Sequence, residues 1–247
     1  MKLLRSTYLA YFSLVFLITM VVFYPLFKWS VANPSKHGFS YKLSRFVARV
    51  ILRFGGMFMK KKHSIALPNE PVIFCPNHTS YIDILTMYAL SERPLIFLGK
   101  KELETWPFIK LFFKGKHVLV DRNNPRAAQK SLEQLKAKLE DGFDVVIFPE
   151  GGIWKNTPKL KPFKMGAFKL SKETGAPIVP VVFYDNWRRF SFKQKGWRLS
   201  PGSLRYSVFP IIDSPKDDTQ DLLPLRDEVY GVLDRALNEH VWKSQTH

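Results

Sequence analysis

The sequence is poor in cysteine. Its 247 residues include one cysteine, Cys75, which excludes an internal disulfide and a cysteine-based zinc site. The histidines show no metal-ligand spacing either, so we predict no bound metal. Cys75 stands in an apolar run with no nucleophile-elbow pattern around it, which predicts a buried strand residue rather than a catalytic thiol.

Negative charge is also scarce. The chain has 21 acidic residues against 38 lysines and arginines, which gives a formal net charge of +17. This balance predicts a polyanionic partner, and the two candidates are nucleic acid and an anionic membrane surface. The 21 phenylalanines favour lipid, although aromatic side chains also stack on bases. The length suits one sizeable globular domain with an appendage.

The first 30 residues contain a long stretch without charge. Residues 6–27 form an uncharged run of 22 residues, long enough to cross the hydrocarbon core as a helix. Three interpretations stay open: a helix that spans the bilayer, a helix that dips into one leaflet, and a signal peptide, for which residues 30–32 resemble a cleavage site. If the helix spans, the richer basic flank on its C-terminal side places the rest of the chain in the cytoplasm.

Residues 40–63 predict a basic amphipathic helix with a basic tail. Apolar residues recur at steps of three and four, basic residues mark another face, and Lys60, Lys61 and Lys62 follow. Such a helix suits an anionic membrane interface, and the alternative is a surface helix packed on the globular domain. We therefore divide the chain into membrane-associating helices at 1–63 and a globular domain at 64–247.

The globular part has an α/β pattern. Apolar runs typical of buried strands alternate with helical patterns, which predicts a mostly parallel central sheet flanked by helices. The clearest helix has Asn124 as N-cap, Pro125 at its first position and Gly142 just past its end. A last helix is expected at 225–242, and the basic, aromatic stretch 188–203 is expected to be an irregular loop or lid. The predicted strands are 72–75, 95–98, 118–120, 145–148, 178–183 and 204–209.

Residues 76–83 follow the first predicted strand and open a helix. His78 offers an imidazole that can take a proton from a hydroxyl, and Asp83 offers a carboxylate that can fix its tautomer. Side chains five positions apart on a regular helix diverge by about 140°. The pair therefore requires His78 before the helix and Asp83 reaching back from the first turn. The alternative is a capping box of Ser80 and Asp83 without chemistry.

Two further features lie at predicted strand ends, where ligands bind in parallel α/β sheets. Glu150 can hydrogen-bond a polyol, and Gly151 with Gly152 lets backbone amides approach an anion; the alternative is a plain turn. Several cations can converge on a phosphate, and the alternative is a solvated basic surface. These cations are Lys100, Arg122, Lys155, Lys159, Lys161 and Lys164.

Residues 77–83 resemble the H-x-x-x-x-D block of the glycerolipid acyltransferase family, typified by 1-acyl-sn-glycerol-3-phosphate acyltransferases (PlsC-like). Later segments resemble the following blocks of that family in the same order, over about residues 72–182. These segments are 99–107, 115–122, 148–151, 162–168 and 177–181. Each block alone is weakly specific, whereas the ordered set is strongly specific.

The resemblance implies a membrane-bound O-acyltransferase that converts lysophosphatidic acid to phosphatidic acid in phospholipid biosynthesis. His78 would be the general base and Asp83 its orienting partner. The residues implied in acceptor binding are Arg122, Glu150, Gly151 and, as a phosphate contact, Lys100. The co-substrate would be an acyl thioester of coenzyme A or acyl carrier protein, with no bound cofactor. The partners would be membrane lipids and not nucleic acid, with the catalytic domain at 64–247 on the cytoplasmic face.

The block around Glu150 departs from the family pattern. The family continues its Glu-Gly pair with Thr, Arg and Ser, whereas residues 152–155 here read Gly-Ile-Trp-Lys. Lys155 can substitute for the arginine as a point charge without the bidentate fork. The acceptor is therefore lysophosphatidic acid held differently or another lysolipid, such as an acylated aminolipid. Two alternatives from other classes are a non-catalytic basic membrane tether and a nucleic-acid-binding protein. The His78/Asp83 pair argues against the first, and the apolar N-terminus argues against the second.

Overall fold

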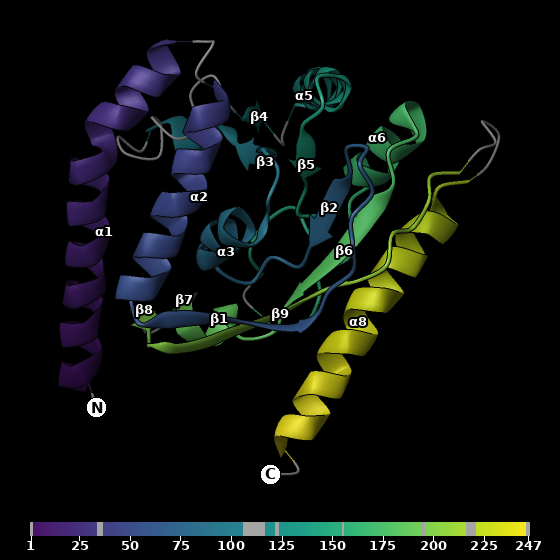
Figure 1. Cartoon of the computed structure of the whole chain (residues 1–247). Coiled ribbons are helices and arrows are strands. Elements are labelled where there is room, and N and C mark those ends of the chain that lie inside the picture. Colours follow the sequence, from purple (N-terminus) through teal and green to yellow (C-terminus); the bar gives the residue numbers. More distant parts are fainter. Residues whose placement is uncertain are drawn as a thin grey trace.

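The chain forms a β-sheet with helices on both faces (Figure 1). The computed structural model describes residues 2–33, 37–105, 117–121, 124–154, 156–193, 196–215 and 221–245. Seven strands follow in the order β1-β9-β6-β2-β5-β3-β4. The β6–β9 pair is antiparallel and the other pairs are parallel, which confirms the predicted α/β class. The strands are β1 (Met57–His63), β2 (Ile73–Pro76), β3 (Leu95–Lys100), β4 (Val118–Val120), β5 (Asp144–Val146), β6 (Ile178–Phe183) and β9 (Gly202–Val208).

The central strands are continuous apolar runs because both of their faces are covered. Every residue of β2, β5 and β6 is buried. This is the pattern expected of parallel strands between two helix layers. These strands could therefore be predicted from their continuous apolar runs. Each of the six predicted strands is present, with its ends within two residues of the prediction.

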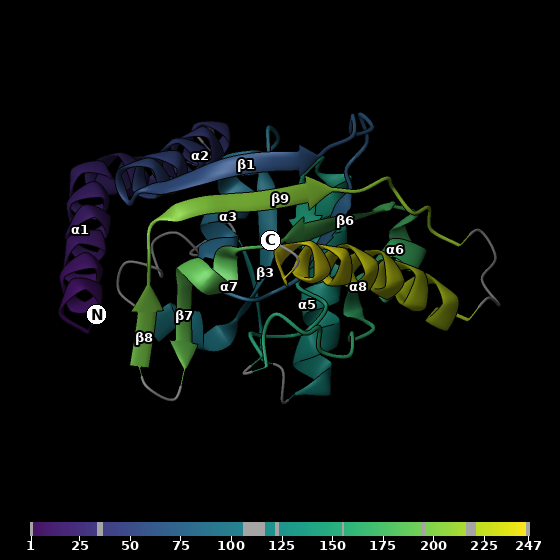
Figure 2. The ribbon, with the colours of Figure 1, turned by 90° about the horizontal axis from the view of Figure 1, so that it is seen from below.

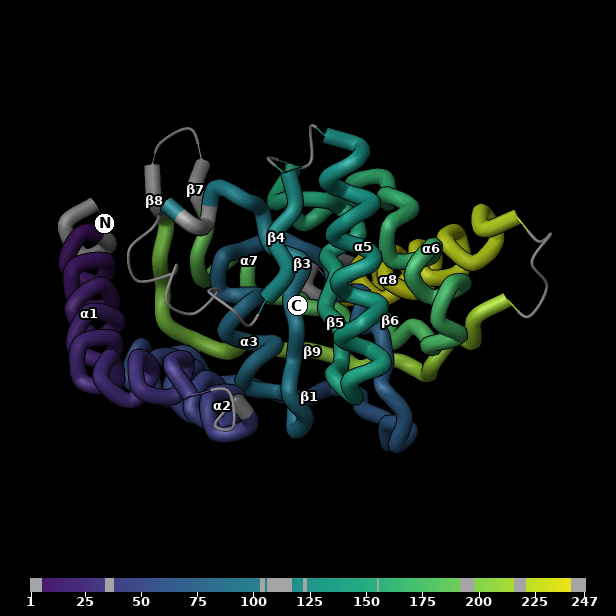
Figure 3. The backbone as a smooth tube through the Cα atoms, turned by 90° about the horizontal axis from the view of Figure 1, so that it is seen from above, coloured from purple at the N-terminus to yellow at the C-terminus, as the bar shows by residue number. Residues whose placement is uncertain are grey.

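The core consists of two apolar clusters, one on each face of the sheet. Phe74 and Val179 face α2 and α3, with α1 packed against α2, whereas the adjacent Ile73 and Ile178 face α5, α6 and α8. Figure 3 shows α1 and α2 on one side of the molecule and α5, α6 and α8 on the other. The helices of these layers are α1 (Lys2–Ala32), α2 (His37–Phe54), α3 (Ile82–Leu90), α5 (Pro125–Glu140), α6 (Gly166–Thr174) and α8 (Leu223–Gln245).

Helix α5 begins where its capping residues predict. The Asn124 side-chain oxygen accepts hydrogen bonds from the backbone amides of Arg126 and Ala127, at 3.0 and 3.2 Å. Pro125 occupies the first helical position, where the missing N–H costs nothing. The predicted N-terminus of this helix is therefore confirmed.

Helices α1 and α2 form an antiparallel hairpin. Near the start of α1, the Tyr11 hydroxyl donates to the carbonyl of Phe54 at 2.6 Å, and near its end Ser30 bonds the Ser40 hydroxyl at 3.2 Å. Ser6–Ala32 is long and apolar enough to cross a membrane, and 17% of its most apolar window is buried. Its exposed apolar side chains include Leu14, Leu17, Ile18, Val21 and Val22.

Two stretches differ from the sequence prediction. Lys60, Lys61 and Lys62 are not the tail of a helix, because they lie in β1, an edge strand whose exposed residues hide its alternation. Residues 188–203 are not irregular either. They contain the end of α7 (Asn186–Arg189) and the β7 (Phe190–Lys193) and β8 (Gly196–Leu199) hairpin, which lies beside the first half of α1 in Figure 2.

Candidate active site

The polar residues of the candidate site follow the carboxyl ends of β2, β5 and β6. Asn77 joins two of these ends: its side-chain oxygen accepts from the Phe183 amide at 2.8 Å, and its side-chain nitrogen donates to the Phe183 carbonyl at 3.1 Å. This pair of bonds extends the pairing of β2 with β6 by one side chain. Asn77 thereby fixes the point from which the chain turns into the His78 loop.

His78 and Asp83 are in contact. His78 Nδ1 lies 2.9 Å from Asp83 Oδ2, with His78 before α3 and Asp83 in its first turn. This is the geometry that the five-residue spacing required. Asp83 is fully buried, whereas the His78 side chain is 13% exposed. His78 Nε2 has no hydrogen-bond partner among the described residues, so this nitrogen can accept a proton from a substrate.

The Asp83 carboxylate also forms a capping box with Ser80 in the turn before α3. Its Oδ2 accepts from the backbone amides of Thr79 and Ser80 at 2.6 and 2.8 Å, and the Ser80 hydroxyl accepts from the Ile82 amide at 3.1 Å. The capping interpretation and the His–Asp interpretation of this segment are therefore compatible. The cap holds the carboxylate in the position from which it bonds His78.

The imidazole plane is set by an aromatic contact. The His78 ring stacks on Phe148, with ring centroids 4.0 Å apart and planes inclined by 22°. Phe148 in turn stacks on Phe97, at 6.5 Å between ring centroids. With one face covered and Nδ1 bonded to Asp83, the ring has little freedom to rotate.

Asn186 is a site residue that the sequence did not reveal. It is fully buried at the start of α7, and its side-chain nitrogen donates to Asp83 Oδ1 at 2.8 Å and to the Thr86 hydroxyl at 3.1 Å. The preceding Asp185 is anchored by Arg205, whose Nε and second guanidinium nitrogen both donate to it at 2.7 Å. Asn186 therefore holds the second oxygen of Asp83 from a rigid support.

Replacing Asn186 by leucine is expected to lower kcat about tenfold to hundredfold with little change in KM. A hydrogen bond to a charged group contributes about 1.5–3 kcal/mol, and its loss leaves Oδ1 of the buried Asp83 without its donor, so the carboxylate is held only through Oδ2. Steady-state kinetics measure the effect. The control is Thr86→Val, which removes the other bond of Asn186 and should be nearly neutral. Equal losses in both variants would contradict a positioning role for Asn186.

Glu150 bonds the backbone of the His78 loop. Its Oε1 accepts from the His78 amide at 2.7 Å and its Oε2 accepts from the Lys161 amide at 2.9 Å. The residue is 1% exposed. Burial raises the pKa of the Glu150 carboxyl to about 7; the two amides oppose this rise and the Asp83 charge adds to it. The described hydrogen bonds of Glu150 go to the backbone amides of His78 and Lys161. Its role in acceptor binding stays a prediction.

The raised pKa of Glu150 predicts a pH-dependent stability. Between its usual pKa of 4.5 and about 7, the unfolded chain releases this proton while the folded chain keeps it, so the free energy of unfolding falls as pH rises. The expected loss is about 3 kcal/mol. Denaturant unfolding of the wild type and of Glu150→Gln, at several pH values across this window, measures it. The wild type should lose this much relative to the variant, and parallel pH profiles would contradict the buried-acid account.

Four predicted site residues remain, and the structure describes two of them, Lys100 and Gly151. Lys100 ends β3, is exposed, and pairs with Glu102 at 2.7 Å. Gly151 has φ +70°, and an added Cβ there would lie 2.8 Å from Cε of Lys164, so the glycine admits a cationic side chain close to the backbone. Arg122 and Lys155 lie outside the described residues.

Cys75 is not part of the site. It is fully buried in β2, as predicted, and burial raises the pKa of its thiol. A buried, protonated thiol is neither a nucleophile nor a metal ligand. In the part of the chain that the structure describes, no group of three or more His, Cys, Asp or Glu side chains could hold a metal ion.

Comparisons with known proteins agree on one family. The family model described as Acyltransferase matches residues 58–184. The chain is 33% identical over 155 residues to the 1-acyl-sn-glycerol-3-phosphate acyltransferase of Cocos nucifera, covering 62% of this chain and 49% of that protein. It is 29% identical over 199 residues to the enzyme of the same name from Haemophilus influenzae, covering 77% of this chain and 78% of that protein.

Two of the relatives are matched over only about half of their length, and the matching crystal structure has low sequence identity. The chain spans about half the length of the Cocos nucifera protein and of a Chlamydomonas reinhardtii relative, which is 33% identical over 161 residues, 64% of this chain and 47% of that one. The crystal structure of the 1-acyl-sn-glycerophosphate (LPA) acyltransferase, PlsC, from Thermotoga maritima superposes with a TM-score of 0.80, covering 96% of both chains at 19% identity. The last match shows a shared fold.

Proposed function

Since this chain belongs to the acyltransferase family, whose model matches just over half of its length, we propose that it transfers a fatty acyl group from an acyl thioester to the free hydroxyl of lysophosphatidic acid, making phosphatidic acid. The contact of His78 with Asp83 at 2.9 Å, at the carboxyl edge of the sheet, carries the proposal. The names of the curated relatives support the acceptor.

His78 acts as the general base. Its Nε2 takes the proton of the lysolipid hydroxyl as that oxygen attacks the thioester carbonyl carbon, and the carbonyl electron pair moves onto oxygen to give a tetrahedral oxyanion. When the oxyanion collapses, the C–S bond breaks and the imidazolium proton goes to the departing sulfur, which leaves as a thiol. Asp83 accepts from Nδ1 throughout and stabilises the imidazolium. No acyl-enzyme is formed.

Cations bind the acceptor phosphate. Lys100 and Lys164 contribute from the described residues, and Arg122 and Lys155 complete the set. Ammonium groups act as point charges and an arginine adds a bidentate contact. Because the residue after Gly152 is isoleucine rather than arginine, the phosphate rests more on lysines than it does in the family pattern.

The α1–α2 hairpin binds the membrane from one side. Helix α2 lies along α1 and carries Lys42, Arg45, Arg49 and Arg53. Each charge at the bilayer centre costs about 2.5–3.5 kcal/mol or more. This favours α1 dipping into one leaflet beside α2, at the interface, over the spanning arrangement. The negative surface potential of the cytoplasmic leaflet attracts a basic helix of this kind, so the catalytic domain lies on the cytoplasmic face.

The hairpin geometry predicts where the N-terminus lies. Tags at both ends of the chain should be cleaved by protease from the same side of sealed membrane vesicles, because neither end crosses the bilayer. Lysed vesicles provide the control for full cleavage. An N-terminal tag protected in sealed vesicles while the C-terminal tag is cleaved would contradict the interfacial hairpin and support a spanning α1.

Release of free thiol tests the proposed reaction. The full chain is given an acyl thioester of coenzyme A or of acyl carrier protein, with and without lysophosphatidic acid, and the thiol is titrated. We expect release that requires the lysolipid. Activity with an acylated aminolipid or another lysolipid but not with lysophosphatidic acid would show that the change at Ile153 alters the acceptor. Silence of the folded protein with every acceptor and both donors would leave the non-catalytic tether as the better account.

A further inference from the structure

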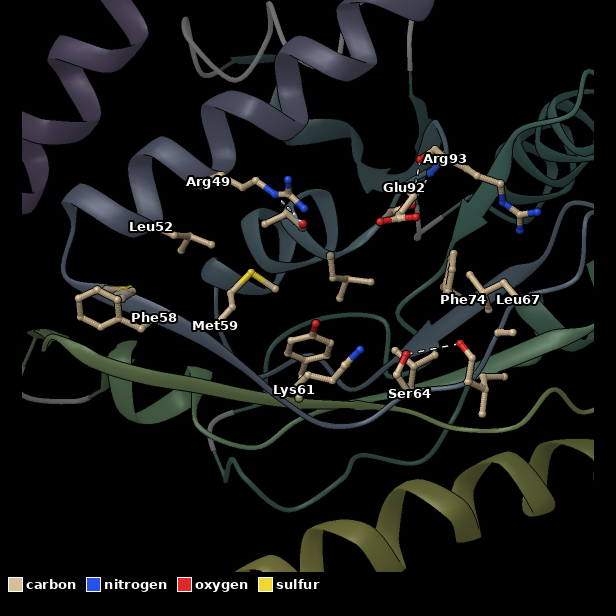
Figure 4. A pocket seen from close by; sticks show the side chains of 18 of the residues that line it. Arg49, Leu52, Phe58, Met59, Lys61, Ser64, Leu67, Phe74, Glu92 and Arg93 are labelled. Atoms are coloured by element: carbon tan, nitrogen blue, oxygen red, sulfur yellow. Dashed lines mark hydrogen bonds between the residues drawn. The ribbon is translucent and has the colours of Figure 1, made fainter.

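A large open groove lies between α2, the end of α3 and strands β1 and β9. Its volume is about 960 Å³. Figure 4 shows Arg49 and Leu52 entering it from α2, and Met59 and Lys61 from β1. The catalytic scheme above uses none of these residues. We call it the Arg49 groove.

The floor of the groove is apolar. Leu52, Met57 and Phe74 belong to the core cluster on this face of the sheet, and Met59 and Leu90 pack against that cluster as partly buried side chains. Leu52, Met57 and Phe74 are buried without a ligand, whereas Met59 and Leu90 are half-buried and leave apolar surface in the groove for a ligand to cover. The floor therefore fits an acyl chain better than a free ion.

The rim carries more cations than carboxylates. Arg45 and Arg93 near one end are paired with Glu92 and Asp144, at 3.4 and 2.7 Å. Arg49, Arg53 and Lys61 have no carboxylate partner among the described residues. Arg49 Nε donates to the Ala89 carbonyl at 3.1 Å. Arg53 has a cation–π contact with Phe58, at 5.0 Å from the ring centroid. Burial and the neighbouring Arg45 lower the pKa of Arg49, and the Glu92 charge opposes this; an anion in the groove would oppose it further.

Exposed apolar side chains line the groove and lie near its cations in the sequence. Phe58 lines the groove and is 44% exposed; Phe46, three positions before Arg49, and Phe54, next to Arg53, are 53% and 64% exposed. A lipid of the leaflet that contacts these side chains can enter the groove. We propose that the Arg49 groove binds one anionic phospholipid that is not a substrate, its phosphodiester on Arg49, Arg53 and Lys61 and one acyl chain along the apolar floor.

Photo-crosslinking tests the site separately from catalysis. The full chain carrying His78→Ala is bound to phosphatidylcholine vesicles that contain a trace of phosphatidylglycerol with a diazirine in one acyl chain. After illumination, peptides are mapped by mass spectrometry, and labelling is normalised to the amount of protein that floats with the vesicles. We expect labelling of residues 57–67 and of Leu90, competed by unlabelled phosphatidylglycerol and not by added phosphatidylcholine or inorganic phosphate.

Charge variants decide what holds the lipid. Arg49→Gln with Lys61→Gln should reduce groove labelling about thirtyfold, since each of the two cations near an anionic headgroup contributes about 1 kcal/mol. Lys130→Gln with Lys169→Gln removes the same charge from exposed positions on α5 and α6, across the sheet, and should leave labelling unchanged. Equal losses in both double variants, or competition by phosphatidylcholine, would overturn the proposal. Competition by lysophosphatidic acid but not by phosphatidylglycerol would overturn it too, in favour of a substrate site.

Discussion

His78→Ala is expected to lower kcat/KM for acyl transfer by about 10³-fold, within the range that one general base contributes. The variant removes the nitrogen that takes the hydroxyl proton and leaves the thioester and the lysolipid in place. Its effect on the fold should be small, because the lost contacts of the ring are the stack on Phe148 and the Asp83 bond, while the backbone bond to Glu150 stays. Initial rates of thiol release and the thermal unfolding curve measure the two effects.

His63→Ala is the matched control for this variant. His63 ends β1, is exposed, and has a ring contact with Phe209, so its loss also removes an imidazole with one aromatic neighbour. We expect nearly wild-type rates from it. A His78→Ala protein that is folded and retains more than about a tenth of the wild-type rate would exclude His78 as the general base, given the contribution of 10²-fold or more that such a base makes.

Asp83→Asn is expected to reduce kcat by about 10³–10⁴-fold, as removal of the carboxylate does in Ser-His-Asp sites. As long as Asn186 keeps its orientation, the amide cannot satisfy all of its neighbours either way round. With its oxygen toward the amides of Thr79 and Ser80, its NH₂ meets the NH₂ of Asn186, donor against donor. With the amide reversed, its NH₂ faces His78 and favours the tautomer that carries the proton on Nε2, which cannot act as a base.

Exchanging the two residue types separates the effect of Asp83→Asn on stability from its effect on kcat. Adding Asn186→Asp restores a donor–acceptor pair between the two side chains but leaves the carboxylate on the wrong side to bond His78. The double variant should therefore recover much of the lost free energy of unfolding and little of the kcat. Recovery of kcat together with stability would contradict the assignment of Asp83 as the residue that orients His78.

The fold was predictable where burial makes the pattern regular. The central strands lie between two helix layers, so their apolar runs are unbroken, and α5 carries its own N-cap in Asn124. The His78–Asp83 contact was predictable because both residues lie within one short segment, and a single turn brings them together. Strand β1 was not found, because an edge strand with exposed lysines lacks the alternation that identifies a half-buried strand.

The residues that hold the site were not predictable in the same way. Asn186 lies 103 positions from Asp83, and Glu150 lies 72 positions from His78. Each contact depends on which strands are neighbours in the sheet, and local sequence pattern does not encode that order. Glu150 was predicted from the residues around it to face a substrate polyol. Its described hydrogen bonds go to backbone amides. These bonds cannot be predicted from the sequence unless the order of strands in the sheet is known.

In the proposed reaction the lysolipid hydroxyl attacks the thioester directly, with His78 as the base. The most direct test follows the wild-type full chain with an acyl thioester, first alone and then with lysophosphatidic acid, by the mass of the intact protein and of the lipid product. The account predicts no acyl adduct on the protein in either case. Phosphatidic acid should form only after the lysolipid is added, in equal amount to the released thiol. An acyl adduct that forms without acceptor and is consumed when the lysolipid arrives would contradict it.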